Sequence, residues 1–250
     1  LGGMGEIGKN MAAIRYGDTI LVIDAGLMFP EDELLGIDIV LPDISYLIEN
    51  RDKVKGVLLT HGHEDHVGGL PYMIKEINVP VYGSRLTIGI AANKLREHDI
   101  DFATLHVVKP RDCVDFGELS VEFIRVCHSI PDCMGIAIHT PMGIVLHTGD
   151  FKLDQTPVDG QTVDFRKLAE IAEKGVLVML SDSTNAERPG FTMSEKVVGN
   201  TFDDLFGKCK GRIIITTFAS NVHRIQQVIR TAEKYNRKVA VSGRSMVNNV

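Results

Sequence analysis

A cluster of histidines and acidic residues directly follows a short apolar run in the first quarter of the chain. After residues 57–59 the sequence reads Thr60-His61-Gly62-His63-Glu64-Asp65-His66. At the end of a strand, alternate side chains point to the same side, so His61 and His63 can reach one ion together. Asp65 and His66 lie beyond the tight turn, where they suit a second ion. Imidazole and carboxylate ligands favour Zn²⁺ or a similar divalent metal, so we predict a metal site here.

Three more side chains follow the ends of predicted strands. His128 comes just after a strand predicted to end at residue 126, and Asp150 just after one ending at residue 148. Ligands at one edge of a sheet can converge on one point, so we expect both side chains to bind metal. Asp24 occupies the same kind of position after residues 19–23. We expect its carboxylate to accept a hydrogen bond from a ligand imidazole and so fix the tautomer of that imidazole.

The hydrophobic pattern predicts strands and helices that alternate along most of the chain. The predicted strands are residues 19–23, 56–60, 120–126, 135–139, 144–148, 176–181, 212–217 and 239–242. The predicted helices are residues 85–98, 165–173, 194–206 and 222–235. Strands dominate first and strict alternation follows, which indicates an α/β layered body followed by the start of a Rossmann-like domain.

Composition narrows the class of protein. The 250 residues are 44% hydrophobic and 24% charged, as in an ordinary globular protein. No apolar run approaches the roughly 20 residues of a membrane span, and no secretory leader opens the chain, so we expect a cytoplasmic protein that does not bind a membrane. The four cysteines form no Cys-x-x-Cys pair, which favours reduced thiols.

The charge is distributed unevenly. The net charge is −6, yet residues 206–250 contain nine lysines and arginines and a single acidic residue, Glu233. Such asymmetry suggests a basic surface on an otherwise acidic body. The alternative is a solvated basic face without a partner.

The metal motif resembles that of the metallo-β-lactamase fold, a four-layered αββα sandwich with a dinuclear metal site. Further stretches resemble bacterial ribonuclease J, in the β-CASP branch of nucleic-acid-cleaving metallohydrolases; they are residues 1–10, 29–38, 182–185, 217–221 and 243–246. The resemblance covers the whole chain in order. It implies a metallo-β-lactamase domain over residues 1–207 and the beginning of a β-CASP domain over residues 208–250. We therefore expect an N-terminal fragment that is inactive on its own.

The resemblance also implies an activity and its metals. Ribonuclease J is a cytoplasmic 5′→3′ exoribonuclease and endoribonuclease that matures ribosomal RNA, degrades messenger RNA and favours 5′-monophosphate ends. Two Zn²⁺ ions, or another divalent metal such as Mn²⁺, are implied. The implied ligands of the first ion are His61, His63, His128 and Asp150, and those of the second are Asp65, His66 and a bridging Asp150. A hydroxide formed between the ions would attack phosphorus and leave a 3′-hydroxyl and a 5′-phosphate.

The β-CASP motifs imply further site residues. Asp182 matches the first acidic motif, which places it with Asp65 and Asp150 among the catalytic residues; on residue chemistry alone it is a turn residue after a strand. The resemblance implies four RNA-binding residues. Phe218 would stack on a base, Ser220 and Asn221 would bind phosphate or base edges, and Arg244 would bind phosphate. We expect RNA as the substrate and a homo-oligomer or a complex with a paralogue.

Three alternatives remain open. The first is a hydrolase of small-molecule esters or thioesters with the same fold, but it has no reason to carry residues 182–185 or a basic segment. The second is a catalytically silent ribonuclease J paralogue acting as an assembly subunit, in which eroded ligands are expected, whereas every ligand position here is filled. The third is a DNA nuclease of the same branch, which residue chemistry does not separate from a ribonuclease.

Overall fold

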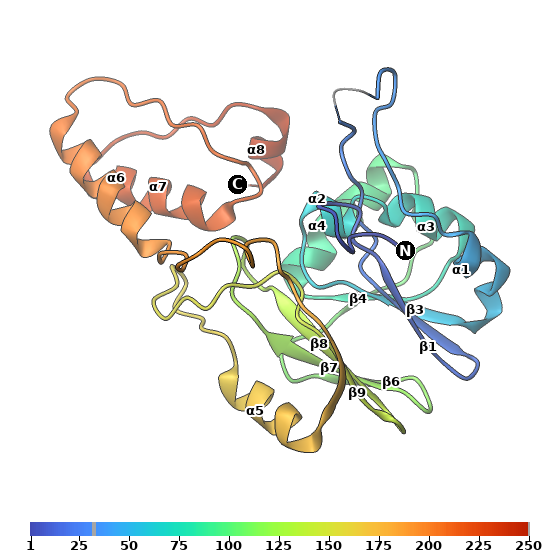
Figure 1. Ribbon diagram of the computed structural model, residues 1–250. Helices are drawn as coiled ribbons and strands as arrows, with labels where there is room; N and C mark the ends of the chain where they lie inside the picture. Colours follow the sequence, from blue (N-terminus) through green and yellow to red (C-terminus); the bar gives the residue numbers. More distant parts are fainter. Residues whose placement is uncertain (32–33, 250) are drawn as a thin grey trace. The chain divides into compact units, whose positions relative to one another are not determined.

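The computed structural model describes residues 1–31 and 34–249, which form two compact units (Figure 1). The first unit comprises residues 1–126, 132–150 and 164–184, and the second comprises residues 127–131, 151–163 and those from 185 onward. Asp32 and Glu33, within the motif at residues 29–38, and Val250, at the end of the predicted second domain, lie outside the described residues.

The first sheet of the first unit is mostly parallel. Its strands, in spatial order, are β1 (Ala12–Tyr16), β2 (Thr19–Ile23), β3 (Val54–Leu58), β4 (Val81–Gly83) and β5 (Leu105–Val107). β1 and β2 form an antiparallel hairpin, and each later strand pairs in parallel with the one before it. Parallel neighbours need crossover connections, and these contain α1 (Ser45–Glu49), η1 (Arg51–Lys53), α2 (Glu64–Val67), α3 (Leu70–Glu76) and α4 (Arg85–Glu97).

The second sheet is mostly antiparallel. Its spatial order is β10 (Val176–Leu180), β9 (Gly143–His147), β8 (Met134–Thr140), β7 (Ser120–Arg125) and β6 (Cys113–Asp115). β6 to β9 form an antiparallel meander, and β10 joins β9 in parallel after α5 (Phe165–Lys174).

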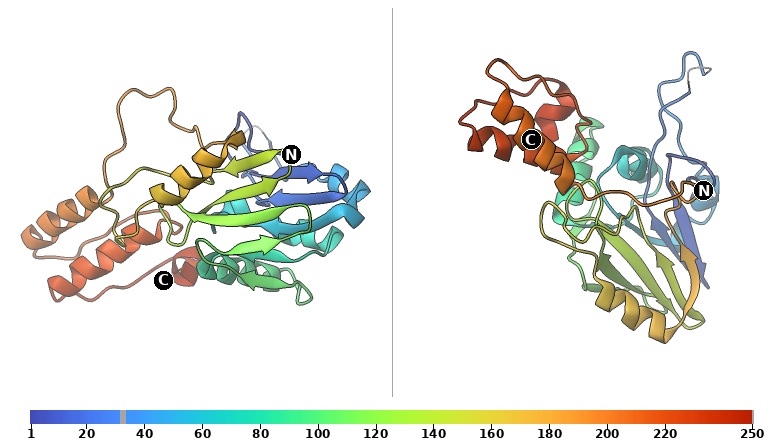
Figure 2. Two further views of the ribbon diagram at one scale, coloured as in Figure 1. Left: turned by 90° about the horizontal axis from the view of Figure 1, so that it is seen from below. Right: turned by 60° about the vertical axis from the view of Figure 1, so that its left-hand side comes forward.

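The two sheets pack face to face. Successive side chains of a strand point to opposite faces, so one strand contacts the other sheet on one side and helices on the other. Leu21 and Ile23 of β2 share a buried cluster with Phe123 of β7, between the sheets. Val22 packs instead against side chains of α3 and α4, and Ile171 of α5 packs on the other face of the second sheet. Figure 2 shows α5 lying along that sheet. These four layers confirm the predicted αββα sandwich.

The second unit is built around two helices that contact each other, α6 (Lys196–Lys208) and α7 (Val222–Lys234), and it ends with the short α8 (Arg244–Asn249). The predicted strands at residues 212–217 and 239–242 are wrong: neither pairs with another strand among the described residues. A strand needs a neighbour for its backbone hydrogen bonds. The side chain of Ile214 is 83% exposed, so this apolar run has no surface to pack on. The predicted boundary at residues 207 and 208 stays a prediction.

Within the described residues, no helix has both the length and the apolar character that crossing a bilayer would require.

A close backbone approach fixes the loop that follows β2. A side-chain carbon built on Gly26 would lie 1.7 Å from the carbonyl oxygen of Asp65 and 2.8 Å from the backbone nitrogen of Asn10. Only glycine fits there, because both neighbours are backbone atoms.

We predict that Gly26→Ala lowers the free energy of unfolding by about 1–3 kcal/mol, the usual cost of overpacking. Chemical denaturation measures it. The matched control is Gly89→Ala, on the exposed side of α4, where the added carbon meets no atom of the described residues within 4 Å beyond its chain neighbours and the backbone of its own helix. That change should raise stability by about 0.5–1 kcal/mol. Equal stability of Gly26→Ala and the unmodified protein would contradict the close approach.

Candidate metal centre

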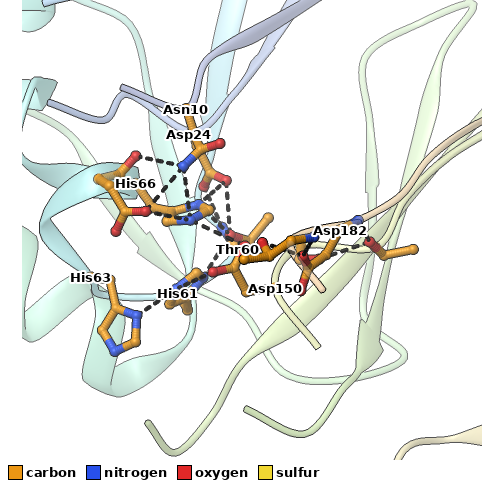
Figure 3. A network of polar contacts seen from close by, with 12 residues as sticks. Asn10, Asp24, Thr60, His61, His63, His66, Asp150 and Asp182 are labelled. Carbon is orange, nitrogen blue, oxygen red and sulfur yellow. Dashed lines mark hydrogen bonds and ion pairs between the residues drawn. The ribbon is translucent and has the colours of Figure 1, made fainter. Parts of the chain in front are cut away.

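The candidate site lies where β2 and β3 end (Figure 3). These strands are parallel neighbours, so the residues that follow them meet at one edge of the sheet. Asp24 comes directly after β2, and its backbone nitrogen donates to the carbonyl of Leu58 at 2.9 Å. The segment from Thr60 to His63 follows β3, and α2 then begins at Glu64. His61, His63 and Asp24 therefore follow the ends of neighbouring strands, as the sequence predicted.

Asp24 is a buried acid that organises this edge. Its carboxylate accepts three hydrogen bonds, each of 2.8 Å, from the backbone N–H of Thr60, the hydroxyl of Thr60 and Nδ1 of His66. The side chain is 1% exposed. Its backbone is left-handed, with φ +59°, a conformation that aspartate and asparagine tolerate better than most residues. The predicted contact between Asp24 and a candidate ligand imidazole is present.

These hydrogen bonds set the tautomers of two histidines. The hydroxyl of Thr60 has one hydrogen and gives it to Asp24, so at 3.0 Å it accepts from Nδ1 of His61. Nε2 of His61 therefore keeps its lone pair. His66 likewise donates from Nδ1 to Asp24, which leaves its Nε2 on the side of the other candidate ligands.

The first group of donors surrounds His61. Nε2 of His61 lies 3.0 Å from Nδ1 of His63 and 3.9 Å from Oδ2 of Asp150. A zinc ion with nitrogen ligands at about 2.0–2.1 Å in tetrahedral geometry spaces those atoms about 3.3 Å apart. The spacing of the two imidazole nitrogens is close to that value, so this donor set fits a divalent cation.

The second group shares a member with the first. Nε2 of His66 lies 3.3 Å from Oδ1 of Asp150 and 3.5 Å from Oδ2 of Asp65. The donor atoms of this group all lie within 4.8 Å of one another. Asp150 thus offers Oδ2 to the first group and Oδ1 to the second, which is one way in which a carboxylate bridges two cations.

The charges around His66 also suit a bound cation. Burial alone would lower the pKa of His66, but the carboxylates of Asp24 and Asp150 outweigh burial and hold that pKa well above its usual range. Without an ion, a proton on Nε2 is the positive charge that these acids stabilise. A divalent cation would replace this proton.

The remaining predicted residues come from other parts of the chain. His128, the fourth member of the first group of candidate ligands, belongs to residues 127–131 of the second unit, and only Cys127 separates it from the end of the preceding segment. Asp182 lies in a turn after β10, where Oδ1 accepts from the backbone and the hydroxyl of Thr184 at 3.0 and 2.8 Å. The predicted RNA-binding residues all lie in the second unit; they are Phe218, Ser220, Asn221 and Arg244.

Sequence reasoning missed two residues of the site, Thr60 and Asn10. Thr60 directly precedes the first histidine. A hydroxyl at that position can both donate and accept a hydrogen bond, and this could have indicated its role beside His61. The carboxamide of Asn10 reaches Asp65, 55 residues later, at 3.1 and 3.2 Å. No local pattern reveals a pairing over that separation.

Comparison with known families agrees with this geometry. The profile of the Metallo-beta-lactamase superfamily matches residues 4–174. The chain belongs to this superfamily. A metallo-beta-lactamase domain is thus confirmed, and a second profile, "Ribonuclease J, beta-CASP domain", matches residues 210–250 of the same chain.

Two relatives similar to this metallo-beta-lactamase superfamily chain are named ribonuclease J. A ribonuclease J from Synechocystis sp. is 52% identical over 99% of this chain and 39% of its own length. A ribonuclease J from Thermus thermophilus is 49% identical over 99% of this chain and 44% of its own length. The resemblance to ribonuclease J is confirmed, and the chain spans about two fifths of the length of these relatives.

A solved structure supports the fold. The crystal structure of a protein of unknown function from Enterococcus faecalis V583 aligns with 95% of this chain and 68% of its own length, with a TM-score of 0.64 at 20% identity.

The first prediction for the site concerns the buried acid. We predict that Asp24→Asn leaves the protein folded but weakens metal affinity roughly 10–100-fold, because the amide cannot accept all three hydrogen bonds. Calorimetric metal titration measures it. Asp99→Asn is the matched control, since Asp99 is also left-handed, with φ +58°, but exposed. Unchanged affinity in Asp24→Asn would reduce Asp24 to a turn residue.

The second prediction concerns pH. Because the folded pKa of His66 is raised above its ordinary 6.5, protonated His66 stabilises the metal-free protein fully below pH 6.5. That stability should be lost as pH rises through the raised pKa. Denaturant unfolding of metal-free protein at increasing pH measures this loss, and Asp24→Asn should flatten the profile. A metal-free stability that is independent of pH in both proteins would contradict the assignment.

Proposed function

We propose that this chain is the metal-binding part of a ribonuclease that hydrolyses RNA phosphodiesters, both as a 5′→3′ exonuclease and as an endonuclease. One observation carries the proposal: two groups of candidate metal ligands share Asp150 in a chain about half identical to proteins named ribonuclease J. A shared carboxylate suits two ions held close together, as in sites that cleave phosphodiesters.

The proposed ligands follow the two donor groups. One ion would be held by His61, His63, His128 and Asp150, and the other by Asp65, His66 and the same Asp150. We propose Zn²⁺, with Mn²⁺ as the alternative, because neutral imidazoles and carboxylates suit both metals. Such ions, when bound, bring the pKa of a coordinated water to about 7 and stabilise negative charge on phosphoryl oxygens.

Asp24 and Thr60 would orient the proposed ligand imidazoles. Asp24 and Thr60 keep Nε2 of His61 and of His66 turned to the ions, so neither ring rotates when substrate arrives. We propose a catalytic role for Asp182 as well. Its backbone nitrogen donates to the hydroxyl of Thr148 at 3.0 Å, two residues before Asp150, which supports a place beside the reacting groups.

The second unit would bind the RNA. Phe218 is 82% exposed, as a side chain that stacks on a base must be. Asn221 caps α7 by accepting from the backbone of Arg224 at 3.1 Å, which leaves its amide N–H groups to donate to phosphate or to a base. Arg244 is exposed and cationic, and we propose that it and Ser220 bind the phosphate backbone of the RNA. A 5′-monophosphate end is the proposed preferred substrate.

The setting is also a proposal. We propose roles in ribosomal RNA maturation and messenger RNA decay, which the resemblance to ribonuclease J implies. Four free cysteines suit the reducing cytoplasm. We propose that the intact protein works as a homo-oligomer or with a paralogue.

We predict that His63→Ala in the intact protein removes bound metal and RNA hydrolysis in parallel, because it deletes an imidazole from the first donor group. Elemental analysis and turnover of a 5′-monophosphorylated RNA measure the two effects. His106→Ala, an exposed histidine outside both groups, is the control and should keep both. Turnover that persists in His63→Ala after metal is lost would rule out a metal-dependent mechanism.

A further inference from the structure

Asn10 places an amide group against both ligands that belong to the second donor group alone. Its Nδ2 lies 3.1 Å from the carbonyl oxygen of Asp65, 3.2 Å from Oδ2 of Asp65 and 3.2 Å from Nε2 of His66 (Figure 3). The carbonyl and the carboxylate only accept hydrogen bonds, so the amide nitrogen, not its oxygen, must face them.

The position of this amide is set by the backbone. The backbone nitrogen of Asn10 donates to the carbonyl of Asp65, and the carbonyl of Asn10 accepts from Gly26, both at 2.9 Å. Lys9, just before it, donates to the carbonyl of Leu27 at 2.9 Å and has a left-handed φ of +40°. Three segments that are distant in sequence are therefore joined by main-chain hydrogen bonds, and a change at the side chain of Asn10 leaves these bonds in place.

The hydrogen bond to Asp65 reaches the oxygen that faces the second donor group. Oδ2 of Asp65, which accepts from Asn10, is also the oxygen 3.5 Å from Nε2 of His66. A carboxylate oxygen has lone pairs for both an N–H and a cation, so the amide can hold Asp65 in a fixed rotamer while that oxygen stays available. Asp65 is otherwise a partly exposed side chain at the start of a short helix and would have to be ordered when an ion binds.

We propose that Asn10 is a positioning residue for the second ion: its carboxamide orients Asp65, and through it sets how tightly that ion is held relative to the first. The inference rests on the two-ion site of the proposed function. The side-chain hydrogen bonds of Asn10 described above reach Asp65 and His66, which belong to the second donor group, so we expect the second ion to sense this side chain more than the first.

The test is a titration of the metal-free intact protein with Co²⁺, followed by visible absorption and calorimetry. The variant Asn10→Leu keeps the approximate shape of the side chain and removes both N–H donors, and Asn10→Ala removes the amide without adding bulk. Asn93→Leu is the matched control on the exposed face of α4. Unmodified protein should bind two ions in two steps with separate spectra.

In both Asn10 variants we expect the first step and its spectrum to persist and the second step to weaken roughly 10–100-fold, the usual effect of losing an outer hydrogen bond to a ligand. The retained first step shows that the variant is folded. Two unchanged steps, or equal weakening of both, would overturn the role of Asn10. A single step in the unmodified protein would instead contradict the two-ion site itself.

Discussion

The buried carboxylate of Asp24 holds the candidate site together. A charge away from water is costly unless it is paired and hydrogen-bonded, and here three donors at 2.8 Å meet it. Two of them come from Thr60 and one from His66, so the same acid sets the orientation of His61, through Thr60, and of His66. The geometry of the candidate metal ligands therefore depends on a residue that is not itself among the grouped ligands.

The αββα sandwich explains why these groups meet. The parallel pairing of β2 and β3 brings Asp24 beside Thr60, and Gly26 lets the backbone of Asp65 approach closely enough for α2 to begin at that edge. The second sheet supplies Asp150 from the loop after β9. The candidate ligands thus come from both halves of the sandwich, and we expect an ion bound to Asp150 to be sensitive to how those halves pack.

The parts of this site that could be predicted are formed by residues that lie close together in the sequence. The ligands between His61 and His66 lie within one turn after a strand, and the strand at residues 19–23 is found with the same bounds. Asn10 was not predicted because its partner is 55 residues away. The strands expected at residues 212–217 and 239–242 were wrong for a related reason: an apolar run becomes a strand only when another strand pairs with it, and a local pattern does not contain the partner.

The proposed function depends above all on the claim that two divalent ions lie on either side of Asp150. Anomalous X-ray scattering from crystals of the intact protein loaded with Zn²⁺ or Mn²⁺ tests this claim most directly. The predicted result is two peaks, one bounded by His61 and His63 and the other by Asp65 and His66. A single peak, or peaks that do not contact Asp150, would contradict the shared-carboxylate centre on which the proposed function depends.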